Sequence, residues 1–234
     1  MNKTAIVTGA SRGLGLELAR ALARRGWALA IDARRAGPLE AARQELETHT
    51  SVVALAGDVR DASHLTQLVE EAGRLGPIAA VVNNASLLGP SPQPALARYP
   101  LSEFREVYEA NVFAPLRLIQ LALPRLETGA RIVNVTSDAG VESYEGWGGY
   151  GSSKAALEHL TSILAAEHPE LRIYWVDPGD MRTEMQQEAF PGEDISGRPP
   201  PSQSVPAFLT LLEGDFPSGR YRASEVADAQ QVRA

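Results

Sequence analysis

Six short apolar runs alternate with longer amphipathic segments, and this order constrains the fold more than any other feature of the chain. Each run is rich in β-branched residues and is closed by Gly, Asp, Asn or Thr. The runs fall at residues 5–7, 28–31, 52–55, 78–82, 132–135 and 173–176. Continuous apolarity without alternation indicates strands buried on both faces, which is typical of a parallel sheet. The order predicts a doubly wound α/β fold of the Rossmann type.

The amphipathic segments between these runs predict helices that cover both faces of the sheet. They fall near residues 13–25, 38–48, 62–74, 102–126 and 151–167. A short helix near 203–213 and a last strand near 219–222 would complete a sheet of about seven strands.

Proline and glycine break the periodicity over residues 186–206, and only about thirty residues follow, which are too few for a second domain. We therefore expect one dinucleotide-binding and catalytic domain over residues 1–234. Within it, residues 86–100 and 181–201 are expected to form loops around a substrate.

Composition excludes several kinds of site. The chain has no cysteine, so disulfides, thiolate zinc sites and cysteine nucleophiles are ruled out. Its four histidines are far apart without ligand spacing, which predicts no metal site. The net charge of -7 argues against a nucleic-acid partner. No apolar run approaches the ~20 residues that span a bilayer, and no signal segment is visible, so we expect a cytoplasmic protein with no membrane partner.

A glycine-rich turn, Thr8-Gly9-Ala10-Ser11-Arg12-Gly13-Leu14-Gly15, joins the first expected strand to the first helix. Its glycines would let the backbone approach a diphosphate, towards which the helix N-terminus directs free N–H groups. Such a turn can also be purely structural. Its position after the first strand of a βαβ pattern favours dinucleotide binding.

Tyr150 and Lys154 are four residues apart and therefore share one face of a helix. A phenol acts as a base near neutral pH only if its pKa falls by about 3 units, and a neighbouring ammonium favours that change. An exposed helix pair would have the same spacing. Ser137 follows the fifth strand, where its hydroxyl could hold a substrate oxygen beside Tyr150, or could simply cap a turn.

Asn111 lies within the expected helix 102–126, and Pro115 follows four residues later. Proline has no N–H, so the carbonyl of Asn111 loses its usual helical partner. That carbonyl could bind a water and extend a proton path from Lys154. The alternative is that Pro115 only kinks the helix.

Together these motifs resemble the short-chain dehydrogenase/reductase (SDR) family over about residues 3–184. The spacing Thr-Gly-x-x-x-Gly-x-Gly matches the family's glycine motif, and the family's catalytic tetrad matches Asn111, Ser137, Tyr150 and Lys154. Ser86 departs from the family, which usually has glycine after the Asn-Asn-Ala motif. The positions that the resemblance and the glycine turn imply for cofactor binding are Gly9, Ser11, Arg12, Gly13, Leu14, Gly15, Arg34, Asp58, Val59, Asn84, Ala85, Tyr150, Lys154, Pro178, Gly179 and Thr183.

Charged residues of both signs, near the end of the second strand and in the glycine turn, bear on which nicotinamide cofactor is bound. Asp32 would accept hydrogen bonds from an unmodified ribose and so favours NAD(H). Arg34, Arg35 and Arg12 could bind a 2′-phosphate instead. On the family pattern Ala33, not Asp32, occupies the discriminating position. We therefore expect NADP(H), with NAD(H) as the alternative.

The resemblance implies an oxidoreductase that transfers hydride between nicotinamide and a small carbonyl or alcohol substrate, with Tyr150 as general acid and base. A dinucleotide-sensing protein without turnover, and an epimerase or dehydratase on the same fold, remain alternatives. Val141, Tyr144 and Trp147 are expected in the pocket wall. Helices 102–126 and 151–167 carry apolar residues over more than one stripe, and the family pairs these helices between subunits. A homodimer or homotetramer is therefore expected.

Overall fold

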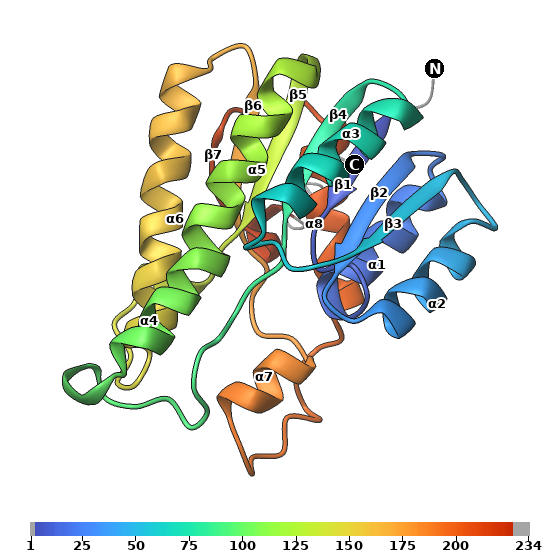
Figure 1. Ribbon diagram of the computed structural model, residues 1–234. Helices are drawn as coiled ribbons and strands as arrows, with labels where there is room; N and C mark the ends of the chain where they lie inside the picture. The colour runs from blue at the N-terminus through green and yellow to red at the C-terminus, as the bar shows by residue number, and fades with distance from the viewer. Residues whose placement is uncertain (1–2, 227–234) are drawn as a thin grey trace.

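A computed structural model, which describes residues 3–226, contains a seven-stranded sheet in the order β3-β2-β1-β4-β5-β6-β7 (Figure 1). Neighbouring strands are all parallel. This confirms the doubly wound fold expected from the alternation of apolar runs. The strands are Thr4–Val7 (β1), Ala28–Ala33 (β2), Val52–Ala56 (β3), Ile78–Asn83 (β4), Leu126–Val135 (β5), Arg172–Asp177 (β6) and Gly219–Arg222 (β7).

Helices cover both faces of this sheet. Helices α1, α2 and α8 pack together on one face, and α3, α5 and α6 cover the other, as Figure 1 shows. The short helix α7 lies below the sheet. The helices are Gly13–Ala23 (α1), Ala36–Leu46 (α2), Ala62–Leu75 (α3), Leu101–Tyr108 (α4), Ala114–Ala122 (α5), Gly148–Glu167 (α6), Glu184–Ala189 (α7) and Val205–Glu213 (α8).

The central strands explain the continuous apolar runs. Every residue of β1, β2 and β4 is buried, because helices cover both faces of the sheet there. The edge strands β3 and β7 are only partly buried. Chain order reverses between β1 and β4, and at such a reversal the loops at the carboxyl ends of the strands diverge and leave a crevice for a ligand.

Three sequence expectations need correction. The expected helix 102–126 is divided by a π-helical turn over Glu109–Phe113, in which the N–H of Ala114 bonds to the carbonyl of Glu109. Such turns accommodate a disturbed helical ladder, and here Pro115 disturbs it. Strand β5 begins at Leu126, six residues earlier than its apolar run, because the pairing with β4 continues through a shift of register. The expected loop 181–201 contains α7.

Within residues 3–226, no helix is both long and apolar enough to cross a membrane.

Candidate active site

A cleft of about 1370 Å³ lies at the carboxyl edge of the sheet. It is bounded by the glycine loop after β1, by the loops after β2 to β6, and by α7. Within residues 3–226, the sequence-predicted site residues line this cleft, except Gly15 and Asn111. Of the three residues expected in the pocket wall, Tyr144 and Trp147 line the cleft, whereas the prediction for Val141 is wrong: this side chain is 51% exposed outside the lining.

The glycine loop has the conformation that its composition predicts. Gly9 and Gly13 have φ of 67° and 57°, the left-handed region that favours glycine. A Cβ on Gly15 would lie 2.5 Å from Nδ2 of Asn84 and 2.6 Å from the carbonyl oxygen of Gly9. Ser11 and Leu14 line the cleft between these glycines. The loop therefore depends on three glycines for its shape, and its backbone is open to a ligand.

Asn84 and Ala85 hold the glycine loop from the neighbouring strand end. The side chain of Asn84 donates to the carbonyl of Thr8 at 2.8 Å, and the Thr8 hydroxyl accepts from the N–H groups of Asn84 and Ala85, each at 3.0 Å. The Asn-Asn-Ala motif therefore also fixes the loop, a role that the sequence did not reveal.

Asp32 borders the cleft, but its carboxylate is not free as the NAD(H) interpretation requires. It is fully buried, with Oδ1 accepting from the N–H of Gly9 at 2.8 Å and Oδ2 lying 3.0 Å from Nε2 of His64. Burial raises the pKa of this carboxyl above its usual range, and the bonds from His64 and Gly9 oppose that shift. Because both oxygens are engaged, Asp32 supports the glycine loop and is not available to a ribose.

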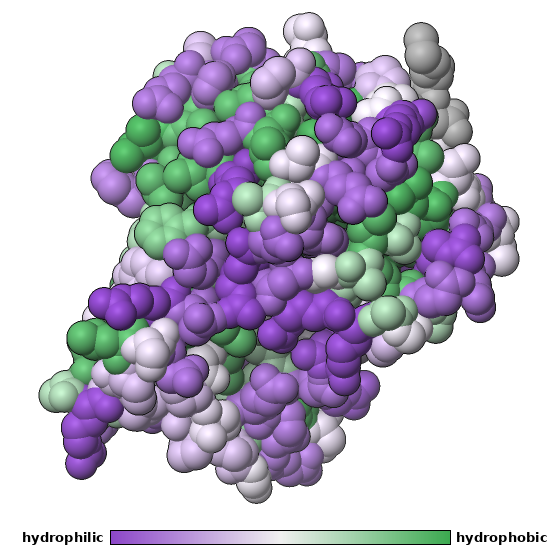
Figure 2. Space-filling model, in the orientation of Figure 1, coloured by the Kyte–Doolittle hydropathy of each residue, from purple (hydrophilic) through white to green (hydrophobic). Residues whose placement is uncertain are grey.

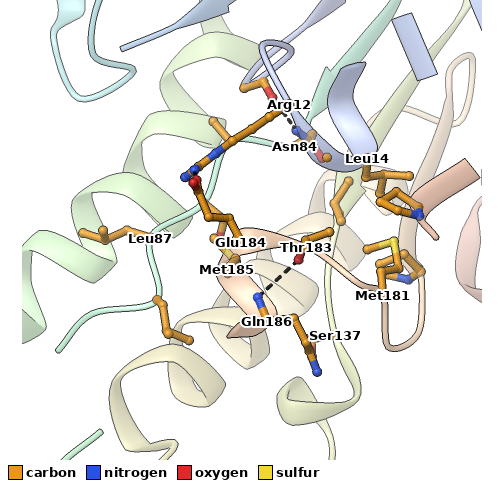
Figure 3. Close-up of a pocket in the computed structure, with 18 of the residues that line it drawn as sticks. Arg12, Leu14, Asn84, Leu87, Ser137, Met181, Thr183, Glu184, Met185 and Gln186 are labelled. Atoms are coloured by element: carbon orange, nitrogen blue, oxygen red, sulfur yellow. Dashed lines mark hydrogen bonds and ion pairs between the residues drawn. The ribbon is translucent and has the colours of Figure 1, made fainter. Parts of the chain in front are cut away.

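Three arginines gather where β2 ends. Arg12, Arg34 and Arg35 line this end of the cleft beside Asp58 and Val59. Because the three cations lie close together, partial burial and repulsion by Arg35 lower the pKa of Arg12. Glu184, at the start of α7, forms ion pairs with Arg12 and Arg35 (Figure 3).

Tyr150 and Lys154 lie at the opposite end of the cleft, on α6. Tyr150 is only 8% exposed, and Nζ of Lys154 lies 5.4 Å from the centre of its ring. The ammonium donates to the carbonyl of Val135 at 2.8 Å. Burial raises the pKa of Tyr150 well above its ordinary value, and hydrogen bonding with Ser137 and Ser86 opposes that shift. Burial lowers the pKa of Lys154 to about 8, against the nearby charge of Glu158.

Ser137 caps a turn, one of the two roles that the sequence allowed, and its contact with a substrate oxygen stays a prediction. Its hydroxyl accepts from the N–H of Ala139 at 3.2 Å and caps the 3₁₀ turn Asp138–Gly140. It also donates to Asp138 at 2.8 Å, and its proximity to the Tyr150 phenol opposes the rise in that group's pKa. The capping turn therefore fixes the serine beside the tyrosine.

Asn111 acts through its side chain. Its Oδ1 accepts from the N–H of Leu87 at 2.8 Å and from the Ser86 hydroxyl at 3.1 Å, while Nδ2 donates to the Leu87 carbonyl and the Ser153 hydroxyl, each at 2.9 Å. The amide thus joins the loop after β4 to α6. Ser86, which stands where the family usually has glycine, joins this network by donating a hydrogen bond from its hydroxyl to Asn111. The water-binding role of the Asn111 carbonyl stays a prediction.

The loop after β6 forms the remaining wall. Pro178 and Gly179 line the cleft, and Gly179 has φ of 75°. The Thr183 hydroxyl accepts from the N–H of Gln186 at 3.2 Å and caps α7, as Figure 3 shows. This segment, expected to bind the cofactor, thus also sets the start of α7.

Sequence reasoning missed the buried pairing of Asp32, which it had considered as a ribose ligand, and missed Glu158 altogether. Asp32 pairs with His64, and Glu158 accepts from Arg220 at 3.1 Å beneath Ser137. A carboxylate at the end of an apolar strand, as at Asp32, was a usable signal because a buried charge requires a partner. Glu158, one helical turn beyond Lys154, carried a similar signal.

The sheet order and the position of this cleft define the class: a doubly wound α/β protein with a dinucleotide-binding crevice. A family model described as short chain dehydrogenase matches residues 3–194. The chain belongs to the short-chain dehydrogenase/reductase family, whose members are oxidoreductases.

Relatives agree with that assignment over most of the chain. It is 32% identical over 198 residues to the benzil reductase ((S)-benzoin forming) of Saccharomyces cerevisiae, covering 80% of this chain and 75% of the relative. A putative short chain dehydrogenase from Pseudomonas syringae superposes with a TM-score of 0.88 at 28% identity, covering 94% of each chain. One from Shigella flexneri, complexed with NADP, has a TM-score of 0.86 at 28% identity and covers 96% and 98% of the two chains.

Proposed function

We propose that this protein reduces a carbonyl compound to an alcohol at the expense of NADPH. The observation that carries the proposal is the buried Tyr150 hydroxyl beside Ser137 and Lys154, at one end of a dinucleotide-sized cleft. Burial keeps this phenol protonated at neutral pH, which suits a proton donor.

The cleft fits an NADP(H) molecule. Left-handed glycines expose the loop backbone to a diphosphate, and Arg12, Arg34 and Arg35 supply cations where a 2′-phosphate would lie. The complex of the Shigella relative with NADP agrees with this choice. We assign the remaining cofactor contacts to Ser11, Leu14, Asp58, Val59, Asn84, Ala85 and the segment Pro178 to Thr183, which line the cleft between these ends.

When bound, NADPH supplies the hydride. Tyr150 donates its proton to the carbonyl oxygen, and Ser137 holds that oxygen by a hydrogen bond. Lys154, buried beside the ring, favours the phenolate that remains. Asn111 keeps the loop after β4 in place against α6.

A Tyr150→Phe variant tests the assignment. It should bind NADPH with wild-type affinity, measured by nicotinamide fluorescence, and reduce carbonyl compounds at least 10²-fold more slowly. Wild-type turnover in this variant would refute the role of Tyr150. Cofactor binding without turnover across a broad panel in the wild type would instead favour a dinucleotide sensor, and nicotinamide retained through purification would favour an epimerase or dehydratase.

We also propose a homodimer or homotetramer formed through α4–α5 and α6. Apolar side chains gather over α5 and α6 on the face shown in Figure 2. Phe113 is 46% exposed and Ile163 is 43% exposed in these helical segments. Light scattering at micromolar concentration should show a dimer or tetramer, whereas a monomer would refute the proposal.

A further inference from the structure

The part of the cleft in front of Tyr150 has an apolar wall. Leu88 and Ala139 are buried against Tyr150, and Trp147, Met185 and Ala189 pack on them while keeping part of their surface exposed. Met185 and Ala189 are one turn apart on α7, so this helix turns one face towards the tyrosine. Leu87 also lines the cleft, as Figure 3 shows.

Three aromatic rings surround Trp147 within this wall. The centre of the Trp147 ring lies 5.8 Å from that of Tyr150, 5.8 Å from that of Phe190 and 6.3 Å from that of Tyr144. The interplanar angles of 72°, 48° and 64° leave these rings inclined to one another rather than stacked in parallel. The Arg198 guanidinium lies 4.2 Å from the centre of the Phe190 ring and holds it in place. A further ring entering here could make the edge-to-face contacts that aromatic groups prefer.

Charges around this wall disfavour an anionic substrate. The carboxylates of Asp138 and Asp177 act on the Tyr150 phenol, and that of Asp180 acts on Tyr144; all three residues line the cleft. Two basic groups also line it: Lys154 is buried and donates to Val135, and Arg182 donates to the carbonyl of Ser196 at 3.3 Å. A substrate carboxylate would meet like charge and lose its hydration.

We infer that the substrate is an uncharged carbonyl compound with an aromatic ring beside its carbonyl, the ring lying against Trp147 and Phe190. The inference rests on the proposed function, because Tyr150 and Ser137 fix where the carbonyl oxygen lies. In the reaction the carbonyl carbon accepts hydride and the oxygen accepts the Tyr150 proton, so the product is an aryl carbinol.

Three related keto compounds separate the effect of the ring from that of charge. Methyl benzoylformate has the ring and no charge, methyl pyruvate lacks the ring, and benzoylformate has both the ring and a carboxylate. With NADPH, the wild-type kcat/KM should be at least about tenfold higher for methyl benzoylformate than for either of the others, since apolar contacts discriminate by such factors. Equal or higher kcat/KM for methyl pyruvate would overturn the inference and leave the proposed function standing.

Variants of Trp147 and Phe190 test where the aromatic ring of the substrate lies. Trp147→Leu should lower kcat/KM about tenfold for methyl benzoylformate and less than twofold for methyl pyruvate, and Phe190→Leu should act in the same direction. Phe216→Leu is the matched control, because Phe216 packs against Tyr221 and lies outside the lining of the cleft. An equal loss for both substrates in Trp147→Leu would overturn the assignment of the ring.

A binding measurement tests whether an aryl group binds beside Trp147 without depending on turnover. Methyl benzoylformate added to the protein with NADP⁺ should quench tryptophan fluorescence, and this quenching should disappear in Trp147→Phe, which keeps an aromatic ring but removes the reporter. If no compound is reduced, the proposed function fails, and Trp147-dependent quenching alone decides whether an aryl group binds. Absence of such quenching would overturn the inference.

Discussion

Two buried carboxylates support the two ends of the cleft, and they do so with different partners. Asp32, beneath the glycine loop, accepts from the N–H of Gly9 at 2.8 Å and contacts the His64 imidazole at 3.0 Å. Glu158, beneath the catalytic loop, accepts from the Thr136 hydroxyl at 2.7 Å and from Nε of Arg220 at 3.1 Å. An imidazole is charged only when protonated, whereas a guanidinium is charged at every accessible pH.

The difference follows from what each carboxylate supports. At the end of β5, three consecutive residues are held by side chains: Lys154 donates to the carbonyl of Val135, Glu158 accepts from Thr136, and Arg220 donates to the carbonyl of Ser137 at 3.3 Å. Asp32 instead binds one backbone N–H of a loop otherwise held by Thr8 and Asn84. The catalytic end therefore depends on a permanent ion pair, and the cofactor end on a single acceptor.

Removal of Arg220 should have the largest effect. Arg220→Met leaves Glu158 buried without its cation, which lowers the free energy of unfolding by about 3 kcal/mol, as urea denaturation would show. The double variant Glu158→Gln/Arg220→Met should recover the part of this loss that Glu158 causes, because the amide at position 158 needs no cation, whereas Asp177, whose carboxylate lies 3.6 Å from Arg220, still loses one. A double variant as unstable as the single one would show that the charge of Glu158 does not set the importance of Arg220.

Loss of the Asp32 acceptor should have a smaller effect, and it should appear in cofactor binding. Asp32→Ala leaves the N–H of Gly9 and the His64 ring unpaired, which should cost about 2 kcal/mol of stability and weaken NADPH binding about tenfold. Asp32→Asn is the control, since its amide can still accept from Gly9, and it should cost less than about 1 kcal/mol. NADPH titration decides: wild-type affinity in Asp32→Ala would mean that the glycine loop keeps its shape without Asp32.

These two pairs also mark how far the sequence could predict the site. Tyr150 and Lys154 lie one helical turn apart, and the loop glycines lie in one short segment, so local spacing was enough to find them. Asp32 and His64 are 32 residues apart, and Glu158 and Arg220 are 62 apart, so their pairing depends on which strand and helix ends meet. The fold followed from apolar runs, whereas the early start of β5 did not, because Glu127, Thr128 and Gly129 carry no strand pattern.

The smallest effect should be a pH dependence of the free energy of unfolding, caused by Asp32 at the cofactor end of the cleft. Burial raises the pKa of Asp32 above its ordinary value of 3.8. At a pH between 3.8 and this raised pKa, Asp32 is therefore protonated in the folded protein but ionised in the unfolded chain. The contribution of Asp32 to the free energy of unfolding is therefore fully present below pH 3.8 and is lost as pH rises through the raised value. Asp32→Asn does not titrate.

The stability of the wild type relative to Asp32→Asn should accordingly decrease as pH rises from about 3 to 7, by about 1.4 kcal/mol for each unit by which the pKa is raised. Urea midpoints of the two proteins, measured at matched pH values in a common His64→Gln background, give this difference, because His64 is the titrating side chain in contact with Asp32. A constant difference would mean that hydrogen bonds to Asp32, such as that from Gly9, offset the cost of burying its charge.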